Sequence, residues 1–420
     1  MLTELVLRLL ALTGLGQSPK ASCRTDLWSI PPCTSELTCG YPFLSFAFRL
    51  KIWNGYSHDR TYSHHPIIDH YDNTTILLWS SAPVDEDSMG QSVMSSVHHG
   101  EYLNWTQPVE MFPPAMLDGE QAHNFSYWCS TGLPQRAWQS SAIVSIPEVY
   151  AIADSYNFIC DPWRSVGAGR VARRIDTATG RPIGDPCWVH KNEYTKELGF
   201  ENTVYGTFGW CEDREKIEAV LKRPETVPAW SDDLYNREHP TADGNHHVRE
   251  VTHAIRHDSI YQRFWRDEAV LNSWHVWTEC SETGEDWYPV HRSTSIYETN
   301  IPDAKTKQFF GRVKLPGTST SASASSRLYL ISNTRQHDPN LHRYPLTIAW
   351  SGGDPWTFRN IGIVHTRPNP DIAKETRDGY KQNPGFSYPS AVQVGDVLFI
   401  AYSENKENIW VAGIPTEVFV

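Results

Sequence analysis

The sequence predicts an all-β protein, and specifically a β-propeller. The chain has 420 residues, of which 40% are hydrophobic, 12% aromatic and 20% charged, so it can build a large ordered core. Its 28 prolines and 26 glycines separate segments rich in β-branched and aromatic residues. This pattern is typical of short strands joined by tight turns and argues against a helical bundle.

A repeated unit supports the propeller prediction. Alternating apolar segments recur, and each group closes with a turn that ends in an aromatic residue, at Trp105, Trp287 and Phe358. Each unit has room for the four strands of one blade. The uneven spacing between units does not fix the number of blades; we expect seven, with six as the alternative. We see no domain boundary, so residues 21–420 are expected to form a single β-propeller domain.

Three other segments carry a local signal. Residues 1–20 are a candidate signal peptide, because a short apolar run is followed by small residues. One helix is expected after Asp213, whose side chain can cap it, with Ile217, Val220 and Leu221 on one face. The low-complexity run 317–326 is expected to be a surface loop between strands.

Cysteine usage predicts a secreted, extracellular protein. The chain has 8 cysteines without a CxxC pair or the spacing of a zinc site, which favours disulfides over buried thiols. Asn73, Asn104 and Asn124 begin glycosylation acceptor tripeptides, although three such tripeptides also arise by chance.

The 49 acidic residues outnumber the 37 basic ones, giving a net charge of −12. We therefore expect no nucleic-acid partner, since phosphate binding needs an extended basic face. No stretch reaches the roughly 20 apolar residues of a membrane span, so no membrane partner is expected, and we expect a monomer.

Three of the closing turns carry a family resemblance. Residues 351–358 resemble a degenerate Asp-box, the hairpin turn of the sialidase-like (BNR) propeller superfamily, and residues 281–287 and 96–105 resemble it more loosely. The run 387–409 is similar to the last blade of the same superfamily. The resemblance spans roughly residues 60–415 and implies the fold. The small polar residues of these turns bond to the turn backbone and the ring packs between sheets, so the turns have a structural role.

The start of the first unit departs from the sialidase pattern. Sialidases place an arginine in an F-R-I-P stretch there, to bind the carboxylate of the substrate; here the stretch reads Tyr-Ser-His-His-Pro, with His64 at the arginine position. An imidazole does not give the permanent two-pronged contact of a guanidinium. The stretch from His65 to Gln91 resembles the rhamnosyl-glucuronate lyases, which are related to sialidases. This resemblance implies removal of a terminal α-L-rhamnose from a 4-linked glucuronic acid by β-elimination.

The candidate catalytic residues are His64, His65 and Tyr388. Elimination needs a base for the C5 proton and an acid for the departing O4, and histidine can serve as both because its pKa lies near neutrality. Since adjacent residues of a strand point to opposite faces, one histidine of the pair could instead be a core residue. Tyr388 precedes Pro389 as His65 precedes Pro66, so we expect these two positions to be equivalent in their blades.

Arg136, Arg249 and Glu250 are the candidates for binding an anionic substrate, expected to be an oligosaccharide or polysaccharide that contains uronic acid. Two other functions stay open. Glu250 with Tyr388 could form the tyrosine nucleophile and acid partner of a sialidase-like exo-glycoside hydrolase, and a propeller without activity could bind glycans as a lectin does. We expect no cofactor, with Ca²⁺ as the one alternative because residues 85–90 resemble an incomplete calcium loop.

Overall fold

The computed structural model describes most of the chain. The described residues are 23–34, 37–86, 90–100, 104–116, 135–158, 166–191, 208–226, 239–257, 260–268, 274–285, 287, 296–317, 326–336, 342–352, 354, 356–368 and 384–420. The candidate signal peptide lies outside these residues, as do most of the low-complexity run, Asn124, Cys129 and Cys160.

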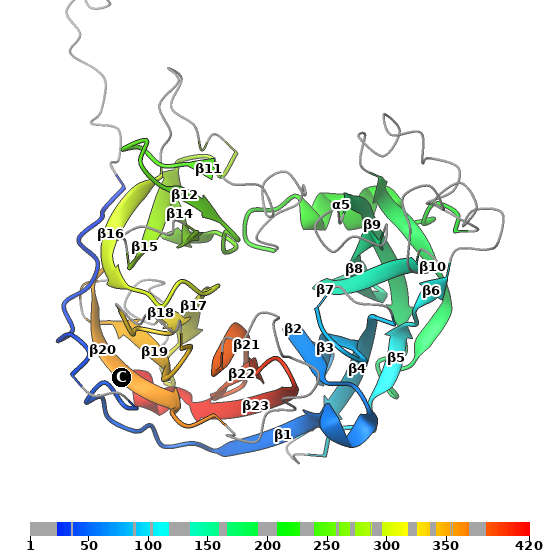
Figure 1. Ribbon diagram of the computed structural model, residues 1–420, viewed down its shortest axis with the longest axis horizontal. Coiled ribbons are helices and arrows are strands. Elements are labelled where there is room, and N and C mark those ends of the chain that lie inside the picture. The colour runs from blue at the N-terminus through cyan, green and yellow to red at the C-terminus, as the bar shows by residue number, and fades with distance from the viewer. Residues whose placement is uncertain are drawn as a thin grey trace, which may run out of the picture.

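The described strands form five antiparallel sheets that stand around a common centre (Figure 1). The first sheet contains β2 (Tyr62–Tyr71), β3 (Thr74–Ala82), β4 (Ser92–His99) and β5 (Val109–Phe112). The second contains β6 (Ala115–Met116), β7 (Gln135–Ser145), β8 (Val149–Phe158), β9 (Val166–Ile175) and β10 (Pro182–Lys191). The third contains β11 (His239–Pro240), β12 (His247–Arg249), β13 (Ile255–His257), β14 (Ile260–Asp267), β15 (His275–Ser281) and β16 (Tyr297–Pro302).

The two remaining sheets complete the arrangement. The fourth contains β17 (Phe309–Lys314), β18 (Ser326–Ser332), β19 (Leu346–Ser351) and β20 (Phe358–His365). The fifth contains β1 (Phe48–Asn54), β21 (Phe386–Val394), β22 (Val397–Glu404) and β23 (Asn408–Pro415). The propeller prediction is therefore supported, but neither seven nor six blades is confirmed, because the described residues form five sheets.

The core lies between neighbouring sheets. Strand β3 is buried along its whole length, because each face of its sheet is covered by the next sheet. One apolar cluster joins the first and second sheets through Leu78 and Trp138, and another joins the first and fifth through Trp79 and Val411. Because these layers pack side by side, the innermost strands β2, β7, β17 and β21 come together near the centre of the ring (Figure 1).

The fifth sheet is built from both ends of the described chain. Strand β1 pairs antiparallel with β23, from Phe48 opposite Gly413 to Asn54 opposite Asn408. Gly413 has no side chain to obstruct this pairing: a Cβ there would lie 2.2 Å from Cε1 of Phe48. The early residues therefore supply the outer strand of the last blade.

The segment before β1 is tied to the outside of the ring. Disulfides join Cys23 to Cys280 and Cys33 to Cys39, and a third joins Cys187 to Cys211 in the second sheet. The described cysteines thus pair as disulfides, as expected. No helix within the described ranges is long and apolar enough to cross a bilayer.

The single described α-helix, α5 (Arg214–Leu221), begins where the sequence predicted. Ile217 and Leu221 are buried against the second sheet, which confirms the apolar face. Asp213 does stand at the N-cap, but its side chain does not cap the helix. Its carboxylate instead accepts hydrogen bonds from Lys216 Nζ and the Tyr150 hydroxyl.

The closing turns have the structural role that the sequence predicted. In residues 351–358, Asp354 accepts hydrogen bonds from the Trp356 amide and the Thr357 hydroxyl. In the turn that follows β15, Ser281 Oγ accepts a bond from the Gly284 amide, and Trp287 Nε1 donates to the Gly284 carbonyl. These turns hold aromatic residues between sheets and contribute no group to the candidate site.

Candidate functional site

Two innermost strands present an unusual backbone at the centre of the ring. In β2 the register shifts between His64 and Ile67, and in β21 it shifts between Ser387 and Ser390. His65 has a φ of 52° and Tyr388 a φ of 53°, a left-handed conformation that is uncommon for residues with a side chain. The predicted equivalence of these two positions is confirmed, since both are left-handed residues in a bulge just before a proline.

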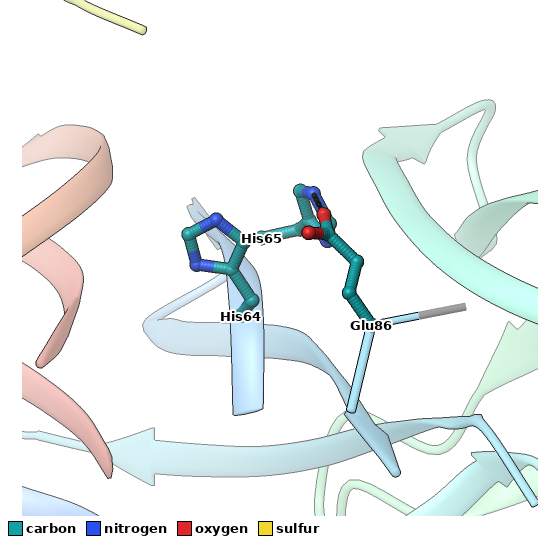
Figure 2. A group of neighbouring side chains, drawn as sticks. All are labelled: His64, His65 and Glu86. Atoms are coloured by element: carbon teal, nitrogen blue, oxygen red, sulfur yellow. Dashed lines mark ion pairs between the residues drawn. The ribbon is translucent and has the colours of Figure 1, made fainter. Parts of the chain in front are cut away.

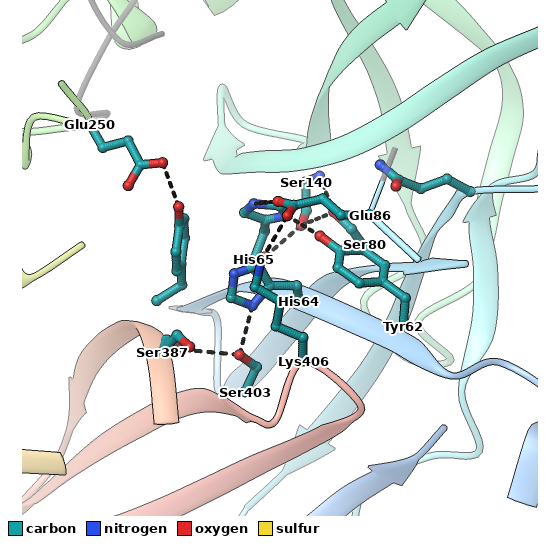
Figure 3. Close-up of polar contacts among 12 residues, drawn as sticks. Tyr62, His64, His65, Ser80, Glu86, Ser140, Glu250, Ser387, Ser403 and Lys406 are labelled. Carbon is teal, nitrogen blue, oxygen red and sulfur yellow. Dashed lines mark hydrogen bonds and ion pairs between the residues drawn. The ribbon is translucent and has the colours of Figure 1, made fainter. Parts of the chain in front are cut away.

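The bulge in β2 gathers both histidines in one place. Their ring centroids lie 4.4 Å apart, and both residues are buried. The Tyr388 ring lies 4.2 Å from the ring of His64 and 5.0 Å from that of His65. The strict alternation that would have turned one histidine away does not apply here, because a bulge adds an unpaired residue to the strand. Figure 3 shows the two rings together, with Ser403 bonded to His64.

Tyr388 is hydrogen-bonded to the carboxylate of Glu250, the residue that follows β12. Its hydroxyl donates a short bond to Oε1 of Glu250. Arg266 Nη1 lies 2.7 Å from Oε2 of the same carboxylate and 3.3 Å from the Tyr388 hydroxyl. Glu250 also has a left-handed φ, of 54°. Strain of this kind persists where surrounding contacts hold a residue in place, and it clusters at functional sites.

The protonation states of Glu250 and Tyr388 follow from their contacts. Burial raises the pKa of Glu250, but the charge of Arg266 and the bond from Tyr388 outweigh burial and lower that pKa to about 2. Burial and the Glu250 charge raise the pKa of Tyr388 well above its usual value. At neutral pH, therefore, Glu250 is ionised and Tyr388 keeps its proton.

His65 is held neutral in the same surroundings. Burial lowers the pKa of His65 to about 3, despite the opposing charge of Glu86. Its Nδ1 lies 3.3 Å from the Tyr62 hydroxyl, and its Nε2 lies 3.5 Å from Oε1 of Glu86. Lys406 Nζ lies 2.7 Å from the other oxygen of that carboxylate. Figure 2 shows Glu86 facing the two imidazoles.

A cavity of about 210 Å³ adjoins this group. Tyr388 and His65 line it, together with Lys307 and the buried ion pair of Asp154 with Arg170. Burial lowers the pKa of Lys307 to about 8, although Glu250 and Asp154 oppose this effect. Lys307 is thus a cation at neutral pH. The cavity has room for one sugar ring and presents a cation, a neutral imidazole and a neutral phenol to it.

Of the two remaining predicted site residues, the structure describes the side chain of Arg249 alone. Arg136 is at the start of β7, opposite Ala115 and Asn157, and its side chain lies outside the described residues. Arg249 precedes Glu250 but pairs with Glu268, with 3.3 Å between Nε and Oε1. It does not line the cavity.

Sequence reasoning missed five cations around the site: Arg170, Arg266, Lys307, Arg343 and Lys406. Arg266 lies in strand β14, which also carries Gln262, Arg263 and Asp267, and it is the arginine that binds Glu250. No local signal separates Arg266 from Arg263 of the same strand, which is buried and pairs with Glu279. Lys406 lies in the turn after β22, has a left-handed φ of 58° and is buried.

The calcium loop that residues 85–90 offered as an alternative is described only in part. Asp87 lies outside the described residues, and the Asp85 side chain accepts a bond from the Glu86 amide. Glu86 itself faces the histidines.

Comparison with known proteins supports the fold. No protein-family model matches the sequence, and no curated protein matches it. A solved structure described as a sialidase is 17% identical, with a TM-score of 0.60, over 93% of this chain and 35% of its own length. A Trypanosoma rangeli sialidase is 10% identical, with a TM-score of 0.46, over 84% of this chain and 54% of its own. The NanB sialidase of Streptococcus pneumoniae is 8% identical, with a TM-score of 0.42, over 88% of this chain and 70% of its own.

The chain therefore spans about a third of the first of these structures and about half of the second. The likeness to the first shows a sialidase-like β-propeller fold. The resemblance to rhamnosyl-glucuronate lyases has no counterpart among these matches.

Proposed function

We propose that this protein is a secreted carbohydrate-active hydrolase that removes a terminal acidic sugar from a glycan, with Tyr388 as its nucleophile. One observation carries the proposal: the Tyr388 hydroxyl, at the wall of a cavity, donates to a carboxylate that Arg266 holds in place. A nucleophile bonded to a base, with the base oriented by a third group, is the general arrangement of covalent catalysis. Tyrosine serves as the nucleophile in sialidases.

The chemistry follows from the charges of the pair. A phenol is neutral, so it can approach the anomeric carbon of an acidic sugar without the repulsion that a carboxylate nucleophile would meet. As the bond from the Tyr388 oxygen to that carbon forms, the bond to the leaving oxygen breaks and the phenolic proton passes to Glu250. The leaving oxygen takes a proton from solvent. Water then attacks the same carbon, releases the sugar and gives a proton back to solvent, while Glu250 returns its proton to Tyr388. Two displacements at one carbon retain its configuration.

The anionic substrate is proposed from the cations around the cavity. Lys307 lines the wall, and its ammonium lies 5.4 Å from the centre of the Tyr388 ring. A sugar carboxylate in contact with Lys307 would therefore place the sugar ring beside the Tyr388 hydroxyl. Secretion is proposed from the three disulfides, which persist in oxidising compartments.

A second candidate is the lyase reaction, and one observation favours it. His65 lines the same cavity as a neutral imidazole, edge-on to Tyr388. It could take the C5 proton of a glucuronic acid, while Tyr388 gives its proton to O4. The electron pair of the C5–H bond would then form the C4=C5 double bond, and the C4–O4 bond would break to release rhamnose.

The test uses substrates that separate the two reactions. Aryl glycosides of sialic acid and of glucuronic acid report hydrolysis, because a phenolate leaves with little need of protonation. Rhamnosyl-glucuronate oligosaccharides report both reactions, since elimination alone adds the ultraviolet absorbance of an unsaturated uronate. We expect sugar release without that absorbance. We also expect a fluoro-sugar to form a covalent adduct, located on Tyr388 by mass spectrometry.

The matched variants are Tyr388→Phe and Tyr402→Phe. Tyr402 is also buried, but its hydroxyl contacts His365 on another sheet. We expect Tyr388→Phe to lower kcat by roughly 10³-fold or more, because it removes the nucleophile, and Tyr402→Phe to keep most of the activity. Sugar release together with the ultraviolet absorbance of an unsaturated uronate, both lost when His65 is replaced, would show that the protein is a lyase. Binding of the oligosaccharides without any turnover would leave a lectin and refute both reactions.

A further inference from the structure

Three metal-ligating side chains meet beside the proposed nucleophile. His64, His65 and Glu86 each offer one ligand atom, and these atoms all lie within 4.8 Å of one another (Figure 2). Both histidines are buried, and the side chain of Glu86 is 12% exposed. The three residues come from β2 and from the loop after β3, so one sheet holds the group rigidly.

His64 carries an unsatisfied nitrogen in this group. Its side chain is 0% exposed, and its Nε2 has no hydrogen-bond partner among the described residues. Buried polar atoms in folded proteins are nearly always bonded, so each exception needs an explanation, such as a bound ion. Nitrogen Nε2 of a neutral imidazole is a common metal ligand.

The other nitrogen of each histidine is already fixed by a hydroxyl. His64 Nδ1 lies 2.7 Å from Ser403 Oγ, and His65 Nδ1 lies 3.3 Å from the Tyr62 hydroxyl. Metal-binding histidines are oriented in this way, by a partner on the nitrogen that does not bind the metal. Lys406 bonds to Oε2 of Glu86 and so leaves Oε1 directed at His65.

The distance between His65 Nε2 and Glu86 Oε1 suits a shared metal ion better than a hydrogen bond. His65 Nε2 and Glu86 Oε1 are 3.5 Å apart, which is longer than an ordinary hydrogen bond. Zn²⁺ binds such atoms at about 2.0–2.2 Å in a tetrahedral arrangement, which separates neighbouring ligand atoms by roughly 3.3–3.6 Å. The observed distance falls in this range.

We propose that His64, His65 and Glu86 bind one divalent transition-metal ion, with Zn²⁺ the best fit. Two imidazole nitrogens and one carboxylate oxygen are the ligands of such ions, whereas Ca²⁺ prefers oxygen alone. Three protein ligands leave a fourth position for water or substrate, as in catalytic zinc sites. The ion adds a permanent positive charge to the start of β2.

The experiment measures metal binding by the whole secreted protein without substrate, so its outcome does not depend on hydrolysis. The protein is dialysed against a chelator, its metal content is measured, and it is titrated with Zn²⁺ and separately with Ca²⁺. Binding of Co²⁺ is followed by visible absorption, which is strong when the ion is tetrahedral. We expect one Zn²⁺ per chain, no comparable binding of Ca²⁺, and a tetrahedral Co²⁺ spectrum.

Matched variants locate the site. Glu86→Gln keeps the size of the side chain and its contact with Lys406, and His64→Asn removes one ligand. His99→Asn is the control, because His99 is exposed at the end of β4. We expect both site variants to weaken Zn²⁺ binding by roughly 100-fold or more and the control to match the native protein.

Circular dichroism of each variant checks that it has folded. If either site variant is unfolded, the Co²⁺ spectrum of the native protein still decides the ligand geometry. Absence of stoichiometric Zn²⁺ binding would overturn the proposal. So would an octahedral Co²⁺ spectrum, or equal losses in the site variants and the control.

Discussion

Replacing Glu250 by glutamine tests whether the Tyr388–Glu250–Arg266 contacts hold a buried charge. Contacts with Arg266 and Tyr388 outweigh burial and lower the pKa of Glu250 from its ordinary value of 4.5 to about 2. A carboxylate with a lowered pKa stabilises the folded state above its unfolded pKa, and this stabilisation is lost as the pH falls through the folded pKa. The difference corresponds to about 3 kcal/mol at neutral pH, of which about 2 kcal/mol is lost by about pH 3.

The assay is unfolding by urea, followed by tryptophan fluorescence at several pH values between about 7 and 3. The free energy of unfolding of the native protein should fall with pH more steeply than that of Glu250→Gln, because glutamine does not titrate. The gap between the two should narrow by about 2 kcal/mol over this range. Glu285→Gln, at an exposed turn, is the control and should follow the native profile. If native protein and Glu250→Gln gave parallel profiles, Glu250 would not be the paired carboxylate described above.

Two further changes test the cavity wall and the pairing of β1 with β23. Lys307→Met should lower kcat/KM for acidic sugars by roughly 10- to 100-fold, because it removes a cation, whereas Lys222→Met, at an exposed position, should not. In the native protein kcat/KM should fall above about pH 8, where Lys307 loses its proton. A kcat/KM that stays constant across this pH range would exclude Lys307 from binding the substrate. Gly413→Ala should destabilise the fold by about 1–3 kcal/mol, because the new Cβ meets Phe48. The control is Gly209→Ala, whose Cβ meets nothing within 4 Å and which should change stability by less than about 0.5 kcal/mol. Equal effects of the two variants in thermal unfolding would contradict the pairing of β1 with β23.

The strands that the sequence could predict are those with a local signal. The repeats near Trp105, Trp287 and Phe358 correspond to strands of the first, third and fourth sheets. The second sheet was missed, because its strands β7 to β10 are long and lack the same aromatic turn. The place of β1 was beyond local reasoning too, since its partner β23 lies more than 350 residues further along the chain.

The candidate site also combines residues that have a local sequence signal with residues that only the packing of the sheets brings there. His65 and Tyr388 could be matched from sequence because each precedes a proline in an innermost strand. That both His64 and His65 face the site could not be foreseen, because the bulge that turns them depends on pairing with β3. Arg266 and Lys406 reach the site from β14 and from the turn after β22 only once the sheets are packed together.

The contact between the first and the last blade has a consequence during synthesis on the ribosome. His64, His65 and Glu86 belong to the first blade, whereas Tyr388, Ser403 and Lys406 belong to the last. A nascent chain that stops before residue 386 would lack the proposed nucleophile and one hydroxyl that orients the imidazoles. Any turnover would therefore require that the last blade has been synthesised and packed against the first, and chains truncated before Tyr388 would be inactive.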